Sequence, residues 1–369
     1  MTHPDRRQYE GLTFAPKRDV PGYYNLWRGF AVPPRQGDCS KFLAHLFDNV
    51  CQGNEDHLNW VLGWFAQLIQ EPGVKLGTAL VLRGKEGCGK SIVGKTIGSL
   101  LGHHYLPVSK PELVTGRFNG HLAHCLLLQA EEAFWAGDRA AAGSLKDLIT
   151  NDDLVLEFKG LEPVRLKNYT RVFSTSNEDW VVPAGMTARR FAVLDVGEKH
   201  VGDEPYFAAI AYEMQNGGRE ALLHHLQQID LCKVDLRSVP KTKALLEQKL
   251  HSLNPLQGWW CDMLMTGRLP PGCNEPRCCP KRTLFDAYLD HANKTGIRRR
   301  AVETLVGTFL KKHVPGLGIR EVRDTGRVYD FPTLSECRMA FAGLIQQEID
   351  WPIQDDWLNG CRHEGFPFH

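Results

Sequence analysis

A glycine-rich loop carries the residues whose types and spacing most clearly support chemistry. The pattern G-x-x-x-x-G-K-[ST] is matched by Gly84, Lys85, Glu86, Gly87, Cys88, Gly89, Lys90 and Ser91. The apolar run TALVLR precedes this loop and the helical run SIVGKTIGSLL follows it. Backbone N–H groups of such a loop surround phosphate oxygens, and the start of a helix adds partial positive charge. We therefore expect ATP here rather than an ordinary glycine-rich turn, with Lys90 bridging the β- and γ-phosphates and Ser91 ligating Mg²⁺.

Two adjacent carboxylates follow a second apolar strand. The run CLLLQA ends in Glu131 and Glu132, at the carboxyl edge of a sheet where open α/β proteins bind ligands. One carboxylate can hold Mg²⁺ through water while the next deprotonates the attacking water. We assign Glu131 to the metal and Glu132 to the water; the alternative is a solvated pair of acids after a core strand.

Two further positions can complete a catalytic set. Asn177 ends the strand RVFSTSN, and its amide can position water against a γ-phosphate, although Ser-Asn is also ordinary turn chemistry. Arg189 and Arg190 precede the apolar run FAVLDV. A guanidinium there can stabilise charge on a transferring phosphate, supplied in a ring by the neighbouring subunit. Two surface arginines are the alternative.

These side chains require an α/β scaffold. Apolar runs alternate with helical patterns between residues 76 and 200, which predicts a doubly wound parallel sheet, and helical patterns continue to residue 253. Residues 1–75 show helical spacing in SKFLAHLFDNVC and LNWVLGWFAQLI, with Asn54 as a cap between them. The predicted domains are a helical domain at 1–75, the α/β domain with the glycine-rich loop, here called the motor, at 76–253, and a third domain at 254–369.

The third domain resembles a winged helix-turn-helix. Helical stretches around 258–265, 284–293 and 301–313 precede a hairpin whose turn contains Asp324 and Gly326. Lys281 to Arg327 holds eleven basic against five acidic residues, whereas the remaining tail holds seven acidic against two basic residues. The basic block suits phosphate contacts on duplex DNA; a solvated subunit-contact domain is the alternative. The arginines concerned are Arg298, Arg299, Arg300, Arg320, Arg323 and Arg327.

Composition narrows the class of protein. The 369 residues carry a net charge of +1 and 43% hydrophobic residues, without an apolar run long enough for a membrane span or a leader segment. A location in the cytoplasm is expected. Eleven scattered cysteines indicate reduced thiols. Cys273, Cys278 and Cys279 with His291 match no standard zinc spacing, so Mg²⁺ is the only metal predicted.

The order of motifs resembles that of superfamily three helicases, and most closely the helicase part of phage and plasmid primase-helicases. The resemblance covers residues 23 to 255 and is carried by GKEGCGKS, LLLQAEE, FSTSN and ARRFAVLDV. It implies a P-loop ATPase core of the AAA+ type, a hexameric ring and an arginine finger at Arg190. The family usually has Asp-Glu where this chain has Glu131 and Glu132.

The resemblance also implies a DNA-contacting hairpin in LVLEFKGLEPVRLK. Lys159 is then the candidate tip residue, with Arg165 and Lys167 behind it; without the family these are exposed cations on a hairpin. No primase fits into the 75 residues before the motor, so a separate primase or replisome partner is expected; the alternative is a natural helicase-only variant.

The predicted function is an ATP-dependent replicative DNA helicase of a phage, plasmid or related mobile element, acting as a homo-oligomeric ring on single-stranded and forked DNA. Three alternatives stay open. One is a DNA-binding initiator or loader without processive unwinding. The others are a defence ATPase derived from such a helicase, and a small-molecule or nucleotide kinase with the same loop.

Overall fold

The computed structural model describes residues 7–110, 112–132, 139–182, 189–273, 275–298, 300–323 and 325–360. Their contacts divide the chain into unit 1, which holds the described residues up to 248, and unit 2, which holds those from 249 onward. Residues 7–75 belong to the same unit as the sheet, and the division falls at Gln248 and Lys249 rather than after residue 253. None of the described helices has the length and apolar character needed to cross a bilayer. Arg299 and Asp324 lie outside the described residues.

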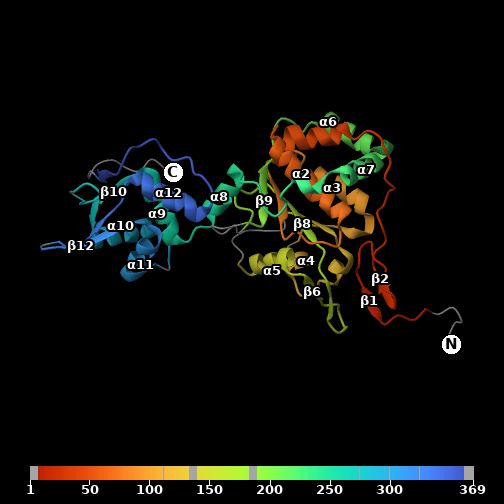
Figure 1. The fold of residues 1–369 in the computed structure, drawn as a ribbon, viewed down its shortest axis with the longest axis horizontal. Coiled ribbons are helices and arrows are strands. Elements are labelled where there is room, and N and C mark those ends of the chain that lie inside the picture. The colour runs from red at the N-terminus through yellow and green to blue at the C-terminus, as the bar shows by residue number, and fades with distance from the viewer. Residues whose placement is uncertain are drawn as a thin grey trace. The chain divides into compact units, whose positions relative to one another are not determined.

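A parallel sheet of five strands forms the centre of unit 1 (Figure 1). Its strands pair in the order β4-β5-β8-β3-β9. Their bounds are Ala79–Arg83 for β3, Tyr105–Val108 for β4, Leu127–Glu131 for β5, Arg171–Ser176 for β8 and Phe191–Asp195 for β9. All six residues of β8 are buried, as expected for a parallel strand covered on both faces. The mixed α/β fold with a central parallel sheet is confirmed. Strand β8 lies between β3, which precedes the glycine-rich loop, and β5, which ends in Glu131.

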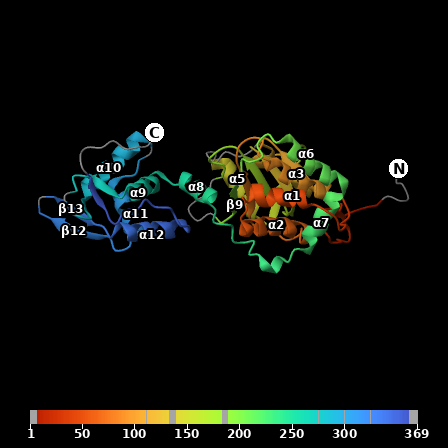
Figure 2. The same ribbon diagram turned by 90° about the horizontal axis from the view of Figure 1, so that it is seen from above.

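Helices surround this sheet. Helix α3 packs on β4, β5 and β8 and also contacts α7, which in turn packs on α2 (Figures 1 and 2). The side chain of Asn54 accepts a hydrogen bond from the His57 N–H at the start of α2, which confirms the expected cap. The helical bounds in unit 1 are α1 Ser40–Ala44, the π-helical turn η1 His45–Val50, α2 Glu55–Gln70, α3 Lys90–Leu101, η2 Gly102–His104, α4 Glu112–Thr115, η3 Gly120–His124, α5 Arg139–Thr150, α6 Glu204–Glu213, η4 Met214–Gly218, α7 Arg219–Gln228 and η5 Leu231–Lys233; α8, Lys243–His251, crosses the division.

Two small pairs of strands extend unit 1. Strands β6, Asp153–Leu156, and β7, Val164–Lys167, form the antiparallel hairpin that the family resemblance implies, with Asp153 opposite Lys167. Strands β1, Gly11–Thr13, and β2, Tyr23–Asn25, pair in parallel near the N-terminus (Figure 1).

Unit 2 contains the three expected helices and the expected hairpin (Figure 2). The hairpin of β12 and β13 is antiparallel, and β11 extends it to a three-stranded sheet of order β11-β13-β12. Helix α12 was not predicted, although Thr333 and Glu336 form a capping box at its start. The bounds are α9 Pro255–Thr266, β10 Arg268–Pro271, β11 Cys278–Pro280, α10 Lys281–Lys294, α11 Glu303–His313, β12 Gly318–Val322, β13 Gly326–Asp330, α12 Leu334–Ile345 and β14 Leu358–Gly360.

Candidate functional site

The glycine-rich loop connects the end of β3 to the start of α3. Gly87 and Gly89 have φ angles of +75° and +92°, which side-chain-bearing residues rarely adopt, and Gly89 is the residue before the first helical turn. The ammonium of Lys90 donates hydrogen bonds to the carbonyls of Gly84 and Lys85, both at 2.6 Å. Lys90 is only 8% exposed, so its charge is held inside the loop. An arriving phosphate can take the place of these carbonyls as the partner of the ammonium.

The remaining loop side chains divide between the surface and the interior. The ammonium of Lys85 forms an exposed ion pair with Glu198 at 2.7 Å, and Glu86 is exposed. Cys88 is fully buried under the loop. The backbone of this loop, rather than these three side chains, is therefore the part suited to holding phosphate.

A glutamine that the sequence reading missed connects the acidic strand to the loop helix. The Gln129 amide donates to Oε1 of Glu131 at 2.7 Å and to the Ser91 carbonyl at 3.3 Å. Its own oxygen accepts from the Tyr105 hydroxyl at 2.7 Å, which fixes the orientation of the amide. Glu131 is thereby held toward the first turn of α3, where Ser91 lies. A carboxylate and a hydroxyl from these two elements are ligand types that Mg²⁺ accepts.

Glu132 has a left-handed backbone. Its φ is +51°, and its N–H donates to the Thr175 carbonyl on β8 at 2.9 Å. A non-glycine residue in this region costs on the order of 1 kcal/mol, and such residues cluster at functional sites. The exposed side chain of Glu132 thus leaves the sheet in a direction that regular strand geometry would not give.

Asn177 follows β8 at the same edge of the sheet and is exposed. Ser176 is in register with Arg83 of β3, and Thr175 is in register with Glu131 of β5. Neighbouring strands are about 4.8 Å apart, so Asn177 lies between the loop and the acidic pair. The structure therefore brings together the predicted loop, both glutamates and Asn177.

Arg190 is not at this edge. Its carbonyl accepts from the N–H of Ala79 at 2.7 Å, at the start of β3, whereas the loop follows the end of that strand. The strand separates Arg190 from the loop of the same chain by roughly 15 Å. The guanidinium cannot complete this chain's own phosphate site without a rearrangement of the sheet.

Arg190 lines a basic hollow of about 460 Å³ together with Arg189 and with two residues that the sequence did not single out, Lys75 and Arg237. Burial, then the charge of Arg171, lowers the pKa of Lys75 to about 7, against an opposing effect of Asp152. The Lys75 ammonium donates to the Asn151 carbonyl at 3.2 Å and to the Leu148 carbonyl at 2.5 Å. The charged residues lining the hollow are Lys75, Asp152, Arg189, Arg190 and Arg237. Three arginines and a lysine whose pKa lies near neutrality surround one carboxylate, so the hollow carries net positive charge and is suited to an anion.

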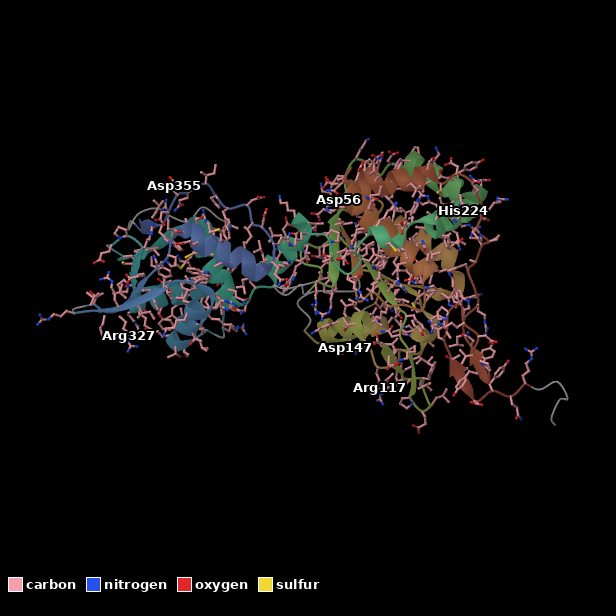
Figure 3. All side chains as sticks on the ribbon, viewed as in Figure 1. Asp56, Arg117, Asp147, His224, Arg327 and Asp355 are labelled. Carbon is pink, nitrogen blue, oxygen red and sulfur yellow. The ribbon has the colours of Figure 1, made fainter. Side chains whose placement is uncertain are left out.

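The β6–β7 hairpin presents its cations unequally. Lys159 lies in the connection between the strands and is exposed, and Arg165 is exposed on β7. Lys167 instead forms an ion pair with Asp153 at 2.9 Å, which lowers the pKa of that carboxyl and raises the pKa of the lysine. Arg117, beside the hairpin in Figure 3, pairs with Glu157 at 2.7 Å. Lys159 and Arg165 are therefore better placed than Lys167 to bind an external phosphate.

The β12–β13 hairpin of unit 2 corrects part of the prediction that its arginines contact DNA phosphates. Arg320 pairs with Asp330 at 3.0 Å and with Glu275 at 2.5 Å, so local carboxylates neutralise its charge. Arg323 and Arg327 are exposed on the hairpin, and Figure 3 shows Arg327 there. The exposed arginines of the hairpin, rather than Arg320, are available for phosphate contacts.

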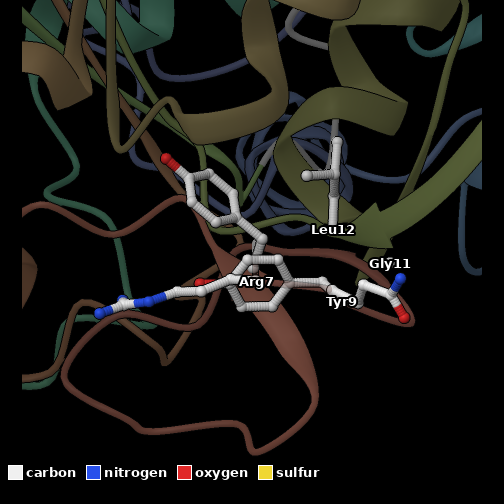
Figure 4. Close-up of a pocket in the computed structure, with 6 residues that line it drawn as sticks. Arg7, Tyr9, Gly11 and Leu12 are labelled. Carbon is white, nitrogen blue, oxygen red and sulfur yellow. The ribbon is translucent and has the colours of Figure 1, made fainter. Parts of the chain in front are cut away.

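Other surfaces and clusters stand apart from this site. A shallow hollow of about 540 Å³ near the N-terminus is lined by Arg7, Gln8, Tyr9, Gly11, Leu12 and Tyr24, none of which belongs to the loop or the acidic strand (Figure 4). The ten cysteines within the described residues are free thiols. No group of three or more potential ligands among His, Cys, Asp and Glu gathers in the described ranges.

The chain is similar to a phage protein in both sequence and fold. Residues 82–190 match a family described as a family of unknown function, DUF5906. A DNA primase-polymerase of Nitratiruptor phage NrS-1 is 23% identical over 212 residues, which are 56% of this chain and 29% of that protein. The chain therefore matches less than a third of the length of this relative.

The solved apo structure of the NrS-1 C-terminal region (305-718) has a TM-score of 0.65 at 17% identity, covering 88% of this chain and 85% of that one. An A-form apo structure of the C-terminal region gives a TM-score of 0.64 at the same identity and coverage. The chain is thus related to a phage DNA primase-polymerase and has the fold of its C-terminal region.

Proposed function

We propose that this chain is an ATP-driven DNA translocase of phage replication, a ring-forming helicase of superfamily three with an AAA+ type core. The observation that carries the proposal is the convergence of the phosphate loop, Glu131, Glu132 and Asn177 at one edge of the parallel sheet. Lys90 would hold the β- and γ-phosphates, and Ser91 and Glu131 would hold Mg²⁺. Bound Mg²⁺ supplies neutralisation of phosphate charge.

The roles of the remaining residues follow from their positions. Glu132 is aimed away from the strand by its left-handed backbone and would take the proton of the attacking water. Asn177 would hold the same water, since its amide can donate and accept. Both lie at the edge that carries the loop, so one bound triphosphate would be within reach of all three elements.

The position of Arg190 supports a shared site between subunits. Arg190 lies at the opposite end of the sheet from its own loop, in a hollow with two further arginines and the partly protonated Lys75. A neighbouring subunit whose nucleotide faced this hollow would supply the missing anion, and the cations would stabilise charge on its γ-phosphate. Ring closure by such head-to-tail contacts is a general route to cyclic assemblies. A hexamer and a separate primase partner stay predictions.

The DNA contacts are proposed at the β6–β7 hairpin, which lies between Glu132 and Asn177 in the sequence. Lys159 and Arg165 are exposed there and would grip the phosphates of a single strand without reading its sequence. Unit 2, with exposed Arg323 and Arg327 on a hairpin next to three helices, would contact duplex DNA.

The deciding experiment measures ATP hydrolysis and strand displacement on a forked duplex by the purified chain. We expect Mg²⁺-dependent hydrolysis that single-stranded DNA stimulates, and separation of the strands. Hydrolysis without displacement would favour an initiator or loader. Phosphorylation of a small acceptor, with turnover insensitive to DNA, would replace the proposal with a kinase.

A further inference from the structure

A π-helical turn in the N-terminal part of unit 1 packs against the glycine-rich loop and forms hydrogen bonds to its backbone. This turn, η1, contributes His45 and Asn49, whose side chains are buried, with residue exposures of 0% and 2%. The two residues are four positions apart and reach consecutive peptide groups of the loop. Such turns often occur at functional sites.

The contacts run to successive carbonyls of the loop. The Asn49 amide donates to the Cys88 carbonyl at 2.7 Å, and Nε2 of His45 lies 3.1 Å from the Gly89 carbonyl. In a planar trans peptide the C=O and the following N–H point in opposite directions. Holding these two carbonyls from outside therefore turns the N–H groups of Gly89 and Lys90 toward the other side, where phosphate would bind.

We propose that His45 and Asn49 are positioning residues that pre-form the anion-binding face of the loop before nucleotide arrives. They act through the loop backbone and do not touch the nucleotide. The inference rests on the proposed function, because it assumes that ATP binds at this loop.

The proton arrangement at His45 follows from its partners. The Gly89 carbonyl can only accept, so Nε2 carries the hydrogen, and Nδ1 accepts from the Tyr206 hydroxyl at 3.2 Å. Burial lowers the pKa of His45, which favours this neutral form. The Tyr206 ring stacks on His200 with centroids 3.7 Å apart, so the second partner is also held in place.

Close packing explains the glycine at the end of the loop. A Cβ at position 89 would lie 2.6 Å from Cε1 of His45 and 2.7 Å from Cε1 of Phe207. Gly89 is thus required by the histidine behind the loop as well as by its own backbone angles. A loop clamped this closely loses little further freedom on binding, which favours affinity.

The test separates positioning from structural support in the full-length chain. His45→Phe keeps a buried ring but removes the Nε2–H donor to Gly89. Asn49→Leu keeps the side-chain volume but removes the amide donor to Cys88. This change breaks no second hydrogen bond, because Oδ1 of Asn49 has no partner within the described residues. Each should raise the KM for Mg·ATP about tenfold, the equivalent of one lost hydrogen bond of about 1.4 kcal/mol, and leave kcat nearly unchanged. His45→Gln, which retains a donor, should recover much of the affinity.

His104→Phe is the matched control. His104 is also 0% exposed, lies 2.8 Å through Nδ1 from the His124 carbonyl and accepts from the Arg28 N–H at 3.0 Å, with neither partner in the loop. It should lower the melting temperature without changing KM. Unchanged KM in both His45→Phe and Asn49→Leu, with melting temperatures lowered as in the control, would overturn the inference. Absence of nucleotide binding by the wild type would instead overturn the proposed function.

Discussion

Arg190 and Lys90 lie at opposite ends of the same parallel sheet. The backbone of Arg190 pairs with Ala79 at the start of β3, and Lys90 begins the helix that follows the loop at the end of β3. If both residues serve ATP hydrolysis, they must serve two different nucleotides. Arg190→Ala and Lys90→Ala should each reduce turnover by at least about a hundredfold, the range seen when one charge-stabilising group is lost.

Mixing the two inactive chains should restore turnover, because some junctions would then combine an intact loop with an intact Arg190. The recovered rate is measured against the mixing ratio, with each variant alone as the baseline. Arg237→Ala from the same hollow is the comparison variant, and it should weaken activity less than Arg190→Ala. Well-mixed assemblies that stay inactive would rule out a site shared by subunits.

Glu132 should show opposite effects on activity and stability. Glu132→Gly relieves the left-handed strain, so the free energy of unfolding should stay constant or rise by up to about 1 kcal/mol. The same change should abolish ATP hydrolysis while nucleotide binding persists. Glu132→Gln, which retains the strain, should abolish hydrolysis with an unchanged melting temperature. Denaturant unfolding and steady-state turnover measure the two effects; hydrolysis at the wild-type rate in either variant would contradict the role of Glu132.

Lys159 and Lys167 provide a matched pair on one hairpin. Lys159 is exposed, whereas Lys167 is paired with Asp153 at 2.9 Å. Lys159→Ala should weaken binding to single-stranded DNA and reduce the slope of log affinity against log salt by about 0.7, the value for one phosphate contact. Lys167→Ala should change both quantities much less. Affinity for single-stranded DNA is measured by fluorescence anisotropy titration. Equal losses of affinity in Lys159→Ala and Lys167→Ala would show that the ion pair does not restrict Lys167.

Lys75 should make stability depend on pH. Burial lowers its folded pKa to about 7 from 10.5, so the unfolded chain binds more protons between these values. The contribution of this residue to the free energy of unfolding therefore rises with pH from about 7 toward 10. The melting temperature of the wild type, minus that of Lys75→Met, should increase by at least about 2 °C between pH 7 and pH 9. A flat or falling difference would mean that the ammonium keeps its ordinary pKa.

Local sequence patterns predicted the elements whose signals lie within a few residues. The loop between β3 and α3 and the strand before Glu131 were each predicted from short contiguous runs, and the structure contains them. The β6–β7 hairpin was expected from the family resemblance, and the structure contains it too. Strand β4 was missed because it is four residues long at the edge of the sheet and contains Pro107, which suppresses a strand prediction. Helix α12 was not predicted, although the capping box of Thr333 and Glu336 marks its start.

Long-range contacts could not be predicted in this way. His45 is 44 positions from Gly89, and Gln129 is 38 positions from Ser91, so no local pattern signals that they meet. Arg320 illustrates the opposite error. It was counted with a basic block along the chain, but it is neutralised by Glu275, 45 positions away, and by Asp330 across the hairpin. Net charge over a segment therefore says little about which cations face solvent.

Strand β8 has a mechanical consequence. The β6–β7 hairpin ends at Lys167, just before β8 begins at Arg171, and Asn177 follows its other end. The strand is about 20 Å long and pairs with β5 over residues 171–175 and with β3 over residues 173–176, so it resists bending. Under the proposed function, a displacement of Asn177 on nucleotide binding would therefore be passed to the hairpin through this one strand, and a glycine substituted within β8 should weaken that coupling.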